Sequence, residues 1–159
     1  MKKKIVVIGF GFMGVVHAKN IIASWKLELC GIVDNRDGDI FAGIESRGFI
    51  IACALALKYN KGMILVRKAG KLPGKVVKTS YTLEYGKATL EIQKDVIQEG
   101  QRVLICDDLL ATGGTAKAAA KLIEKINGTI VGFAFIIELL ELNGRDKIKD
   151  YRSESLVEY

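Results

Sequence analysis

RVLICDDLLATGGT, residues 102–115, joins an apolar strand to a turn of small residues and then to a helix. The predicted strand ends in two adjacent acids, Asp107 and Asp108. In open α/β sheets, ligands bind at the carboxyl ends of the strands. The free backbone N–H groups and the positive end of the dipole at a helix N-terminus can hold a phosphate. The segment therefore predicts a site for a phosphorylated ligand where this strand meets this helix.

The turn itself, from Ala111 to Thr115, has residues that suit a phosphate turn. Gly113 and Gly114 permit unusual φ angles and a close approach of the backbone, while Thr112 and Thr115 add hydroxyl donors. The Gly-Lys-Ser/Thr ending of a Walker A loop is missing. A plain turn with a helix cap would leave two neighbouring like charges without an external partner. We therefore expect the turn to bind phosphate and the acids to bind another part of the same ligand.

Outward from this segment, short β-rich apolar runs alternate with helical patterns. Because the runs are apolar on both faces, they fit a sheet that helices cover on both sides. We expect an α/β, three-layer sandwich with a mostly parallel sheet. The predicted strands are 4–9, 28–34, 39–44, 63–68, 102–108 and 130–137, and the predicted helices are 13–25, 47–59 and 115–127.

Three segments carry further expectations. Helix 47–59 is apolar nearly all round and should be buried. Residues 68–91 form a long, basic and polar stretch with the only proline, and a connection of that length is typical of a lid or a binding loop. Residues 35–39 leave no room for a crossover helix, so the strands on either side are antiparallel neighbours or belong to separately assembled pieces.

Length and composition suit one soluble domain, with 159 residues of which 50% are hydrophobic and 26% charged. No apolar run is long enough to span a bilayer, so we expect a cytoplasmic protein without a membrane partner. Cys30, Cys53 and Cys106 lie far apart without CxxC spacing, which argues against disulfides and zinc. The net charge of +6 is spread along the chain, so phosphorylated small molecules are expected as anionic partners and nucleic acid is not.

Basic residues lie at two other strand ends. Ser46 and Arg47 follow strand 39–44 and open the next helix. A guanidinium beside free backbone N–H groups suits a diphosphate. Arg67, Lys68 and Lys71 lie at the end of strand 63–68 and just beyond it. Cations that converge from two strand ends predict an anion between them, and we expect these five residues to bind a diphosphate.

Four segments occur in the order found in adenine phosphoribosyltransferases, which are type I phosphoribosyltransferases. They are IESRGF at 44–49, VRKAGKLPG at 66–74, SYTLEYGKATLEIQKD at 80–95 and VLICDDLLATGGT at 103–115. The chain resembles that family over about residues 39–159. The resemblance implies a phosphoribosyltransferase-like fold and a homodimer. It also implies the purine-salvage reaction, in which adenine and 5-phosphoribosyl 1-diphosphate give AMP and diphosphate.

The resemblance also assigns roles to residues. Asp107 and Asp108 would hold the ribose hydroxyls, and the turn that follows would hold the 5′-phosphate. Mg²⁺, carried by the diphosphate without a direct protein ligand, would stabilise the leaving charge together with Arg47, Lys68 and Lys71. Glu84 and Tyr85 would face the reacting centre, where Glu84 handles the proton of the purine.

The N-terminal residues carry a different pattern. Gly9, Gly11 and Gly14 follow a predicted strand as GxGxxG, and Asp34 ends the next strand. This dinucleotide-binding βαβ pattern resembles the start of the Gfo/Idh/MocA oxidoreductases. We expect a Rossmann-type segment, 1–38, packed as a single domain with a phosphoribosyltransferase core, 39–159. The chain would then be a chimera in which this segment replaces the N-terminal hood over the base, and turnover would be impaired.

Two other hypotheses stay open at this point. The glycine turn would make the protein an NAD(P)- or nucleotide-binding module without catalysis. Alternatively, the chain is an inactive engineered chimera that combines fragments of two α/β folds.

Overall fold

The computed structural model describes residues 3–8, 27–33, 40–82 and 86–159, the first two ranges by their backbone alone. β1 (Lys3–Ile8) and β2 (Leu27–Val33) pair in parallel and form a two-stranded sheet of their own. Both strands lie close to their predicted positions. Of the two alternatives for the strands on either side of residues 35–39, that of antiparallel neighbours is wrong, because the strand that follows β2 belongs to the other sheet; the topology agrees with separately assembled pieces. The division of the chain at residue 38 stays a prediction.

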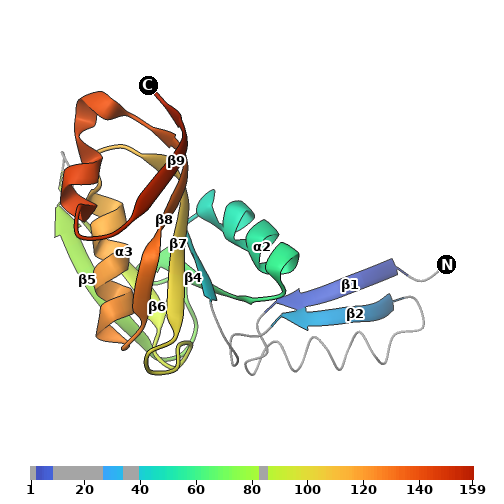
Figure 1. Cartoon of the computed structure of the whole chain (residues 1–159). Coiled ribbons are helices and arrows are strands. Elements are labelled where there is room, and N and C mark those ends of the chain that lie inside the picture. The colour runs from blue at the N-terminus through green and yellow to red at the C-terminus, as the bar shows by residue number, and fades with distance from the viewer. Residues whose placement is uncertain (1–2, 9–26, 34–39, 83–85) are drawn as a thin grey trace.

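The main sheet has seven strands in the order β5-β6-β4-β3-β7-β8-β9 (Figure 1). From β4 to β9 neighbouring strands are parallel, whereas β5 and β6 form an antiparallel hairpin at one edge. This mostly parallel sheet confirms the predicted fold class. The strands are β3 (Ile40–Ile44), β4 (Gly62–Lys68), β5 (Val76–Thr82), β6 (Lys87–Gln93), β7 (Arg102–Leu110), β8 (Thr129–Glu138) and β9 (Ser153–Glu158).

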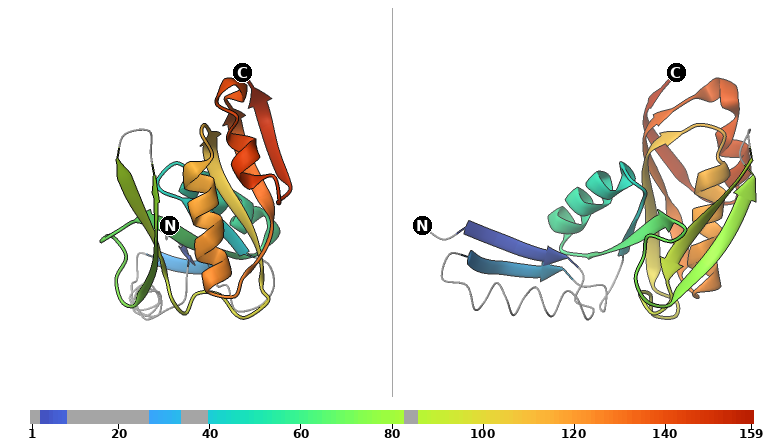
Figure 2. Two further views of the ribbon diagram at one scale, coloured as in Figure 1. Left: turned by 90° about the vertical axis from the view of Figure 1, so that its left-hand side faces the viewer. Right: turned by 180° about the vertical axis from the view of Figure 1, so that it is seen from behind.

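Two helices cover opposite faces of this sheet, as Figure 1 and Figure 2 show: α2 (Gly48–Tyr59) and α3 (Gly114–Lys125). The period of two along β3 divides its side chains between the faces. Ile40 and Ala42 belong to the large core cluster that contains α3, whereas Phe41 packs with Ala52 of α2. The sheet is therefore the middle of three layers, and neither helix is long and apolar enough, in the described part of the chain, to cross a membrane.

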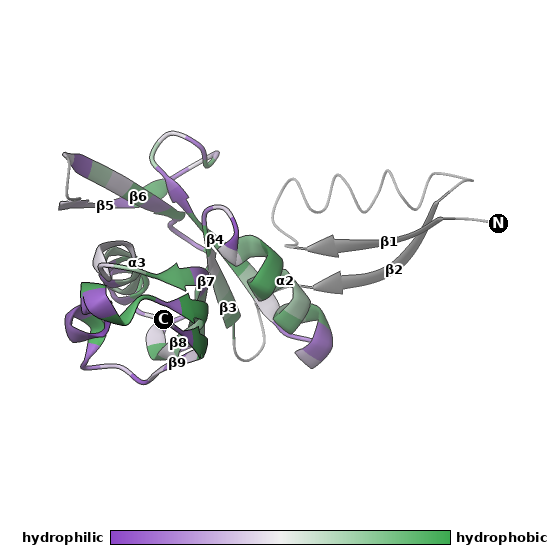
Figure 3. Cartoon of the chain, turned by 90° about the horizontal axis from the view of Figure 1, so that it is seen from above, coloured by the Kyte–Doolittle hydropathy of each residue, from purple (hydrophilic) through white to green (hydrophobic). Residues whose placement is uncertain are grey.

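The prediction that helix 47–59 is buried all round is wrong. Ile50 and Leu57 of α2 are 73% and 47% exposed, and its buried residues are Gly48, Ala52 and Ala56. Figure 3 shows α2 as hydrophobic over most of its length. The sheet covers one face of the helix, so an apolar composition all round did not translate into burial all round.

Residues 68–91 are not a single loop, in contrast to the prediction. Half of them lie in the two strands of the β5–β6 hairpin, whose register pairs Ser80 with Thr89 and places their hydroxyls 2.9 Å apart. The near-alternate tyrosines and threonines of β5 are the period-two pattern of a strand. The polar composition obscured that pattern.

Three C-terminal elements were not predicted: the 3₁₀ helices η1 (Leu140–Leu142) and η2 (Gly144–Ile148), and the edge strand β9. A buried carboxylate, Glu138 of β8, joins two of them, η2 and β9. Arg145 Nε donates a hydrogen bond of 2.9 Å to Glu138, and Ser155 Oγ donates one of 2.8 Å. Ile148 of η2 also packs in the large core cluster, so both this network and apolar contact position η2.

Candidate active site

A cavity of about 550 Å³ lies where β3, β4 and β7 end. It gathers the whole predicted phosphate turn and both acids with Ser46, Arg47 and Lys68. We call residues 107–115 the β7 side of the cavity, and residues 45–47 together with 67–72 the β3–β4 side. The lining consists of Glu45–Arg47, Lys68, residues 107–116, and Tyr81, Ala88 and Leu90 of the hairpin.

The phosphate turn leads into α3 as predicted. Gly113 has a φ of 73°, in the left-handed region that glycine adopts without strain. A Cβ at Gly113 would collide with the carbonyl oxygen of Gly144, and a Cβ at Gly144 would collide with that of Ala111. The turn therefore rests directly on the backbone of η2, which requires glycine on both sides. No side chain caps α3, and its first turn lines the cavity, an arrangement that suits a phosphate.

The two adjacent acids of β7 have different surroundings. Asp107 Oδ1 accepts a hydrogen bond of 3.0 Å from the backbone N–H of Asp108. Burial, with the neighbouring charge of Asp108, raises the pKa of Asp107 to about 7. Asp108 is paired with Arg47, at 2.7 Å between Oδ2 and Nε. Asp108 thus has a cationic partner in Arg47, whereas Asp107 titrates near neutral pH in the ligand-free protein.

Arg47 joins the two sides of the cavity. It immediately precedes α2, its side chain is 70% exposed, and its ion pair reaches from the end of β3 to β7. Gly48 permits this close approach, because a Cβ there would collide with the carbonyl oxygen of Cys106. The guanidinium is therefore available to an anion in the cavity while Asp108 orients it.

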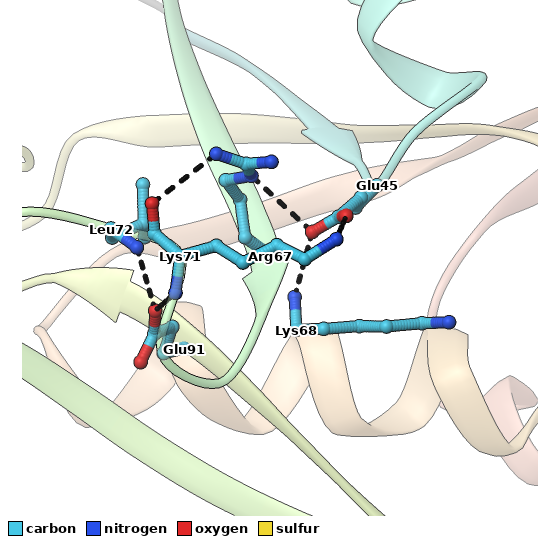
Figure 4. Close-up of polar contacts among 6 residues, drawn as sticks. All are labelled: Glu45, Arg67, Lys68, Lys71, Leu72 and Glu91. Atoms are coloured by element: carbon cyan, nitrogen blue, oxygen red, sulfur yellow. Dashed lines mark hydrogen bonds and ion pairs between the residues drawn. The ribbon is translucent and has the colours of Figure 1, made fainter.

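The cations of the β3–β4 side fall into two groups (Figure 4). Arg67 Nε lies 3.3 Å from one carboxylate oxygen of Glu45, and Lys71 Nζ is hydrogen-bonded to the other. Lys68 donates its backbone N–H to Glu45 at 3.0 Å, while its side chain points away from this group and lines the cavity. Among the three cations that strand 63–68 and its turn supply, Lys68 is the one that lines the cavity. A diphosphate-binding role for Arg67 and Lys71 stays a prediction.

A second buried carboxylate, Glu91 of β6, holds the same turn. Its side chain is 1% exposed and accepts the backbone N–H groups of Lys71 and Leu72, each at 2.8 Å. Burial alone would raise the pKa of Glu91, but these hydrogen bonds and the charge of Lys78 hold it below its ordinary value. Sequence reasoning missed both Glu45 and Glu91. The available signal was an acid placed at or within an apolar strand.

Tyr81 of β5 connects the hairpin to the phosphate turn. The hydroxyl of Thr115 lies 3.3 Å from that of Tyr81, and both residues line the cavity. Sequence reasoning missed Tyr81 because it treated this segment as a loop, and the alternation of the strand was the signal that could have found it. The remaining predicted site residues lie outside the described part of the chain: Glu84, Tyr85, Gly9, Gly11, Gly14 and Asp34.

A model of the phosphoribosyl transferase domain family matches residues 3–158. The chain belongs to the phosphoribosyltransferase family. Because the match begins at residue 3, it does not support the interpretation of residues 1–37 as a segment of a Gfo/Idh/MocA oxidoreductase, or of the chain as a chimera. A parallel strand pair and a glycine-rich turn are common to βαβ units in general, so they do not identify one family.

Relatives of this phosphoribosyltransferase are similar to it over most of the chain. The adenine phosphoribosyltransferase of Nitrosopumilus maritimus is 76% identical over 121 residues, which are 76% of this chain and 71% of that protein. The crystal structure of the Thermoanaerobacter pseudethanolicus adenine phosphoribosyltransferase has a TM-score of 0.75 at 40% identity, and the match covers 91% of this chain and 78% of that one. The Saccharomyces cerevisiae adenine phosphoribosyltransferase, complexed with adenine and an imino-altritol bisphosphate, has a TM-score of 0.73 at 43% identity. That match covers 76% of this chain and 68% of the yeast chain.

Proposed function

We propose that this phosphoribosyltransferase acts on adenine, converting it with 5-phosphoribosyl 1-diphosphate to AMP and diphosphate. Membership of the family and the names of its relatives support the reaction. Within the chain, the observation that carries the proposal is the Arg47–Asp108 ion pair of 2.7 Å. It joins a phosphate turn and two acids to a cationic strand end on one cavity, as a phosphorylated sugar with a diphosphate group requires.

The β7 side is proposed to hold the ribose 5-phosphate part of the substrate. The backbone N–H groups of residues 111–115 and the hydroxyls of Thr112 and Thr115 would bind the 5′-phosphate. Asp107 and Asp108 would accept hydrogen bonds from the ribose hydroxyls. Because the pKa of Asp107 is about 7, hydrogen bonds donated by the ribose hydroxyls would favour its ionised form, which accepts them.

The β3–β4 side is proposed to hold the diphosphate. When diphosphate leaves, negative charge grows on its oxygens while the anomeric carbon becomes positive. Arg47 and Lys68 line the cavity and would stabilise that leaving charge, with Ser46 as a hydroxyl donor. Arg67 and Lys71 are added to this group on the sequence pattern, because they lie at the end of the same strand or just beyond it.

The purine end of the site rests on the resemblance. Glu84 is proposed to take the proton of adenine and Tyr85 to face the reacting centre. The yeast relative, at 43% identity, is a complex with adenine, which supports adenine as the base.

Mg²⁺ is the proposed cofactor. In the ranges that the structure describes, no three His, Cys, Asp or Glu side chains cluster to hold a metal ion. Phosphate oxygens are good ligands for this hard cation, so the cavity fits an ion that arrives on the diphosphate. Asp107 and Asp108 would then hold it indirectly, through the ribose hydroxyls. When bound, the ion neutralises charge on the leaving group.

The test is conversion of radiolabelled adenine to AMP with 5-phosphoribosyl 1-diphosphate and Mg²⁺, beside a variant with Asp107→Ala and Asp108→Ala. We expect AMP from the unmodified protein and little or none from the variant. Hypoxanthine and guanine in place of adenine measure the preference for the base. The proposal fails if the folded, unmodified protein forms no AMP and calorimetry detects binding of neither the substrate nor AMP. A homodimer, also proposed from the resemblance, is checked by sedimentation equilibrium.

A further inference from the structure

Glu45 is a buried acid at the edge of the cavity, directly after β3. Its side chain is 8% exposed, and it lines the cavity beside Ser46 and Arg47. A buried carboxylate costs free energy unless hydrogen bonds and counter-charges compensate it. Glu45 has both: the guanidinium of Arg67, the ammonium of Lys71 and the backbone N–H of Lys68.

These contacts arrange the turn after β4. Arg67 and Lys71 approach Glu45 from two sides, and Arg67 also lies over the ring of Phe49, at 5.9 Å from the centroid. With these two cations engaged, the ammonium of Lys68 has no hydrogen-bond or ion-pair partner among the described residues, and the Lys68 side chain points away from Glu45 (Figure 4). The backbone N–H of Lys68 is held while its side chain stays available to an anion.

The electrostatics of Glu45 agree with this arrangement. Burial alone would raise the pKa of Glu45, but the hydrogen bonds from Lys71 and Lys68 and the charge of Arg67 hold it below its ordinary value. Glu45 therefore stays ionised at neutral pH. Its negative charge also offsets part of the positive charge of its two partners.

We propose that Glu45 is a positioning residue that acts through Lys68. It anchors the turn so that the ammonium of Lys68 meets the leaving diphosphate, and Glu45 itself has no contact with the substrate. This role rests on the proposed function, because it concerns the diphosphate side of that reaction. A competing role has the opposite consequence: if Glu45 withheld Arg67 and Lys71 from the diphosphate, its removal would strengthen diphosphate binding.

The test is a double-mutant cycle on diphosphate affinity, measured by calorimetry with Mg²⁺. One charged hydrogen bond is worth about 1.5–3 kcal/mol, so Lys68→Ala is expected to weaken diphosphate binding by roughly 10- to 100-fold. Glu45→Gln keeps the size of the side chain and one acceptor for the Lys68 N–H, and a loss of about fivefold is expected because it removes the ionic anchors. In the Lys68→Ala background, Glu45→Gln should cause no further loss, since residues that act as one unit are not additive.

Controls separate this role from simple loss of structure. Ribose 5-phosphate is proposed to bind on the β7 side, so its affinity should be unchanged in Glu45→Gln. Glu154→Gln removes one negative charge from an exposed pair with Arg152 and should leave diphosphate binding unchanged. Glu45→Asp retains the carboxylate, and we expect it to retain diphosphate affinity within about twofold.

Three results would overturn the positioning role: tighter diphosphate binding by Glu45→Gln, losses that add to those of Lys68→Ala, or a Glu45→Asp protein as impaired as Glu45→Gln. If Glu45→Gln loses ribose 5-phosphate binding as well, the diphosphate affinity of Glu45→Asp is measured with and without Lys68→Ala. Losses that add would then overturn the positioning role. An unmodified protein that forms no AMP and binds no diphosphate would overturn the proposed function together with this role. Normal AMP formation with additive losses overturns this role alone.

Discussion

The β7 side of the cavity comes from one continuous segment, residues 107–115, whereas the β3–β4 side is assembled from two strand ends and a turn that other elements hold in place. The first side presents backbone N–H groups and two carboxylates, and its shape is set by glycines at close backbone contacts. The second presents long cationic side chains whose directions depend on the buried acids Glu45 and Glu91. A substitution on the β7 side should therefore disturb the backbone of the turn. A substitution on the β3–β4 side should change where the cationic side chains point.

The largest expected effect is on the glycine contact of the β7 side. In Gly113→Ala, a Cβ in the left-handed region would also collide with the Gly144 carbonyl, so we expect the free energy of unfolding to fall by about 3 kcal/mol or more. Gly74→Ala is the matched control, because Gly74 has a φ of 79° but no atom within 4 Å of its Cβ position. Its loss should be about 1 kcal/mol. Urea denaturation measures both, and equal losses would contradict the packing of the turn on η2.

The next effect concerns the ion-paired acid of the same side. Asp108→Asn keeps the shape of the side chain but removes the ionic partner of Arg47 and the charge of the proposed hydrogen bond to the ribose. We expect kcat/KM to fall by about 100-fold, equivalent to about 2.7 kcal/mol. Stability should change little, since the Arg47 side chain of this pair is 70% exposed. Steady-state kinetics and a thermal melt measure the two, and a large drop in stability with little kinetic loss would mean that the pair is structural.

Arg47→Ala tests the residue that joins the two sides. Removing this exposed guanidinium, which is proposed to stabilise the leaving group, should lower kcat/KM by about tenfold with less than about 1 kcal/mol of lost stability. Arg152→Ala removes another exposed, ion-paired arginine and should leave kinetics unchanged. If both variants lower kcat/KM equally, the effect comes from net charge and not from position.

Tyr81→Phe sharpens the comparison at the hairpin. The variant removes only the hydroxyl near Thr115, and a neutral hydrogen bond is worth about 0.5–1.5 kcal/mol. We expect ribose 5-phosphate to bind about two- to tenfold more weakly, with diphosphate affinity unchanged. Calorimetry measures the affinity for each ligand separately. An equal loss of affinity for both ligands would mean that Tyr81 affects the whole cavity and not the β7 side alone.

The smallest expected effect is on the pH dependence of stability. The pKa of Asp107 is raised to about 7 in the folded protein, so the native state binds more protons than the unfolded state between the ordinary pKa and 7. Stability from this group is therefore present at low pH and is lost as pH rises toward 7. Asp107→Asn should be more stable than the unmodified ligand-free protein at pH 8, by a few degrees in Tm, and the difference should shrink at pH 5. A difference independent of pH would contradict the shifted pKa.

Much of the β7 side could be predicted because its parts are neighbours in the chain. A strand, two acids and a glycine turn before a helix form a local pattern, and local backbone preferences determine its geometry. The β3–β4 side could be predicted only in part. Arg47 lies where its helix start predicts, but Glu45 meets Arg67 and Lys71 across 22 and 26 residues of chain. No local pattern contains that pairing.

The hairpin and the C-terminal elements show the same limit. Residues 76–82 alternate as a strand does, yet their polar composition favoured a loop, and β6 was needed as a partner to make a sheet edge of them. Glu138 and Arg145 fix η2 and β9 through a buried network that sequence spacing does not reveal. The apolar composition of α2 likewise did not tell which of its faces the sheet would cover.

The amino-acid sequence by itself determined the α/β layering, the phosphate turn with its two acids, and the resemblance to phosphoribosyltransferases. Those features depend on periodicity, glycine placement and short motifs, which act over a few residues. Only the tertiary structure decided which cations face the cavity, that Tyr81 meets Thr115, and that Glu45 and Glu91 hold the turn after β4. The physical reason is that a buried charge takes whichever partners the whole fold brings within hydrogen-bond distance.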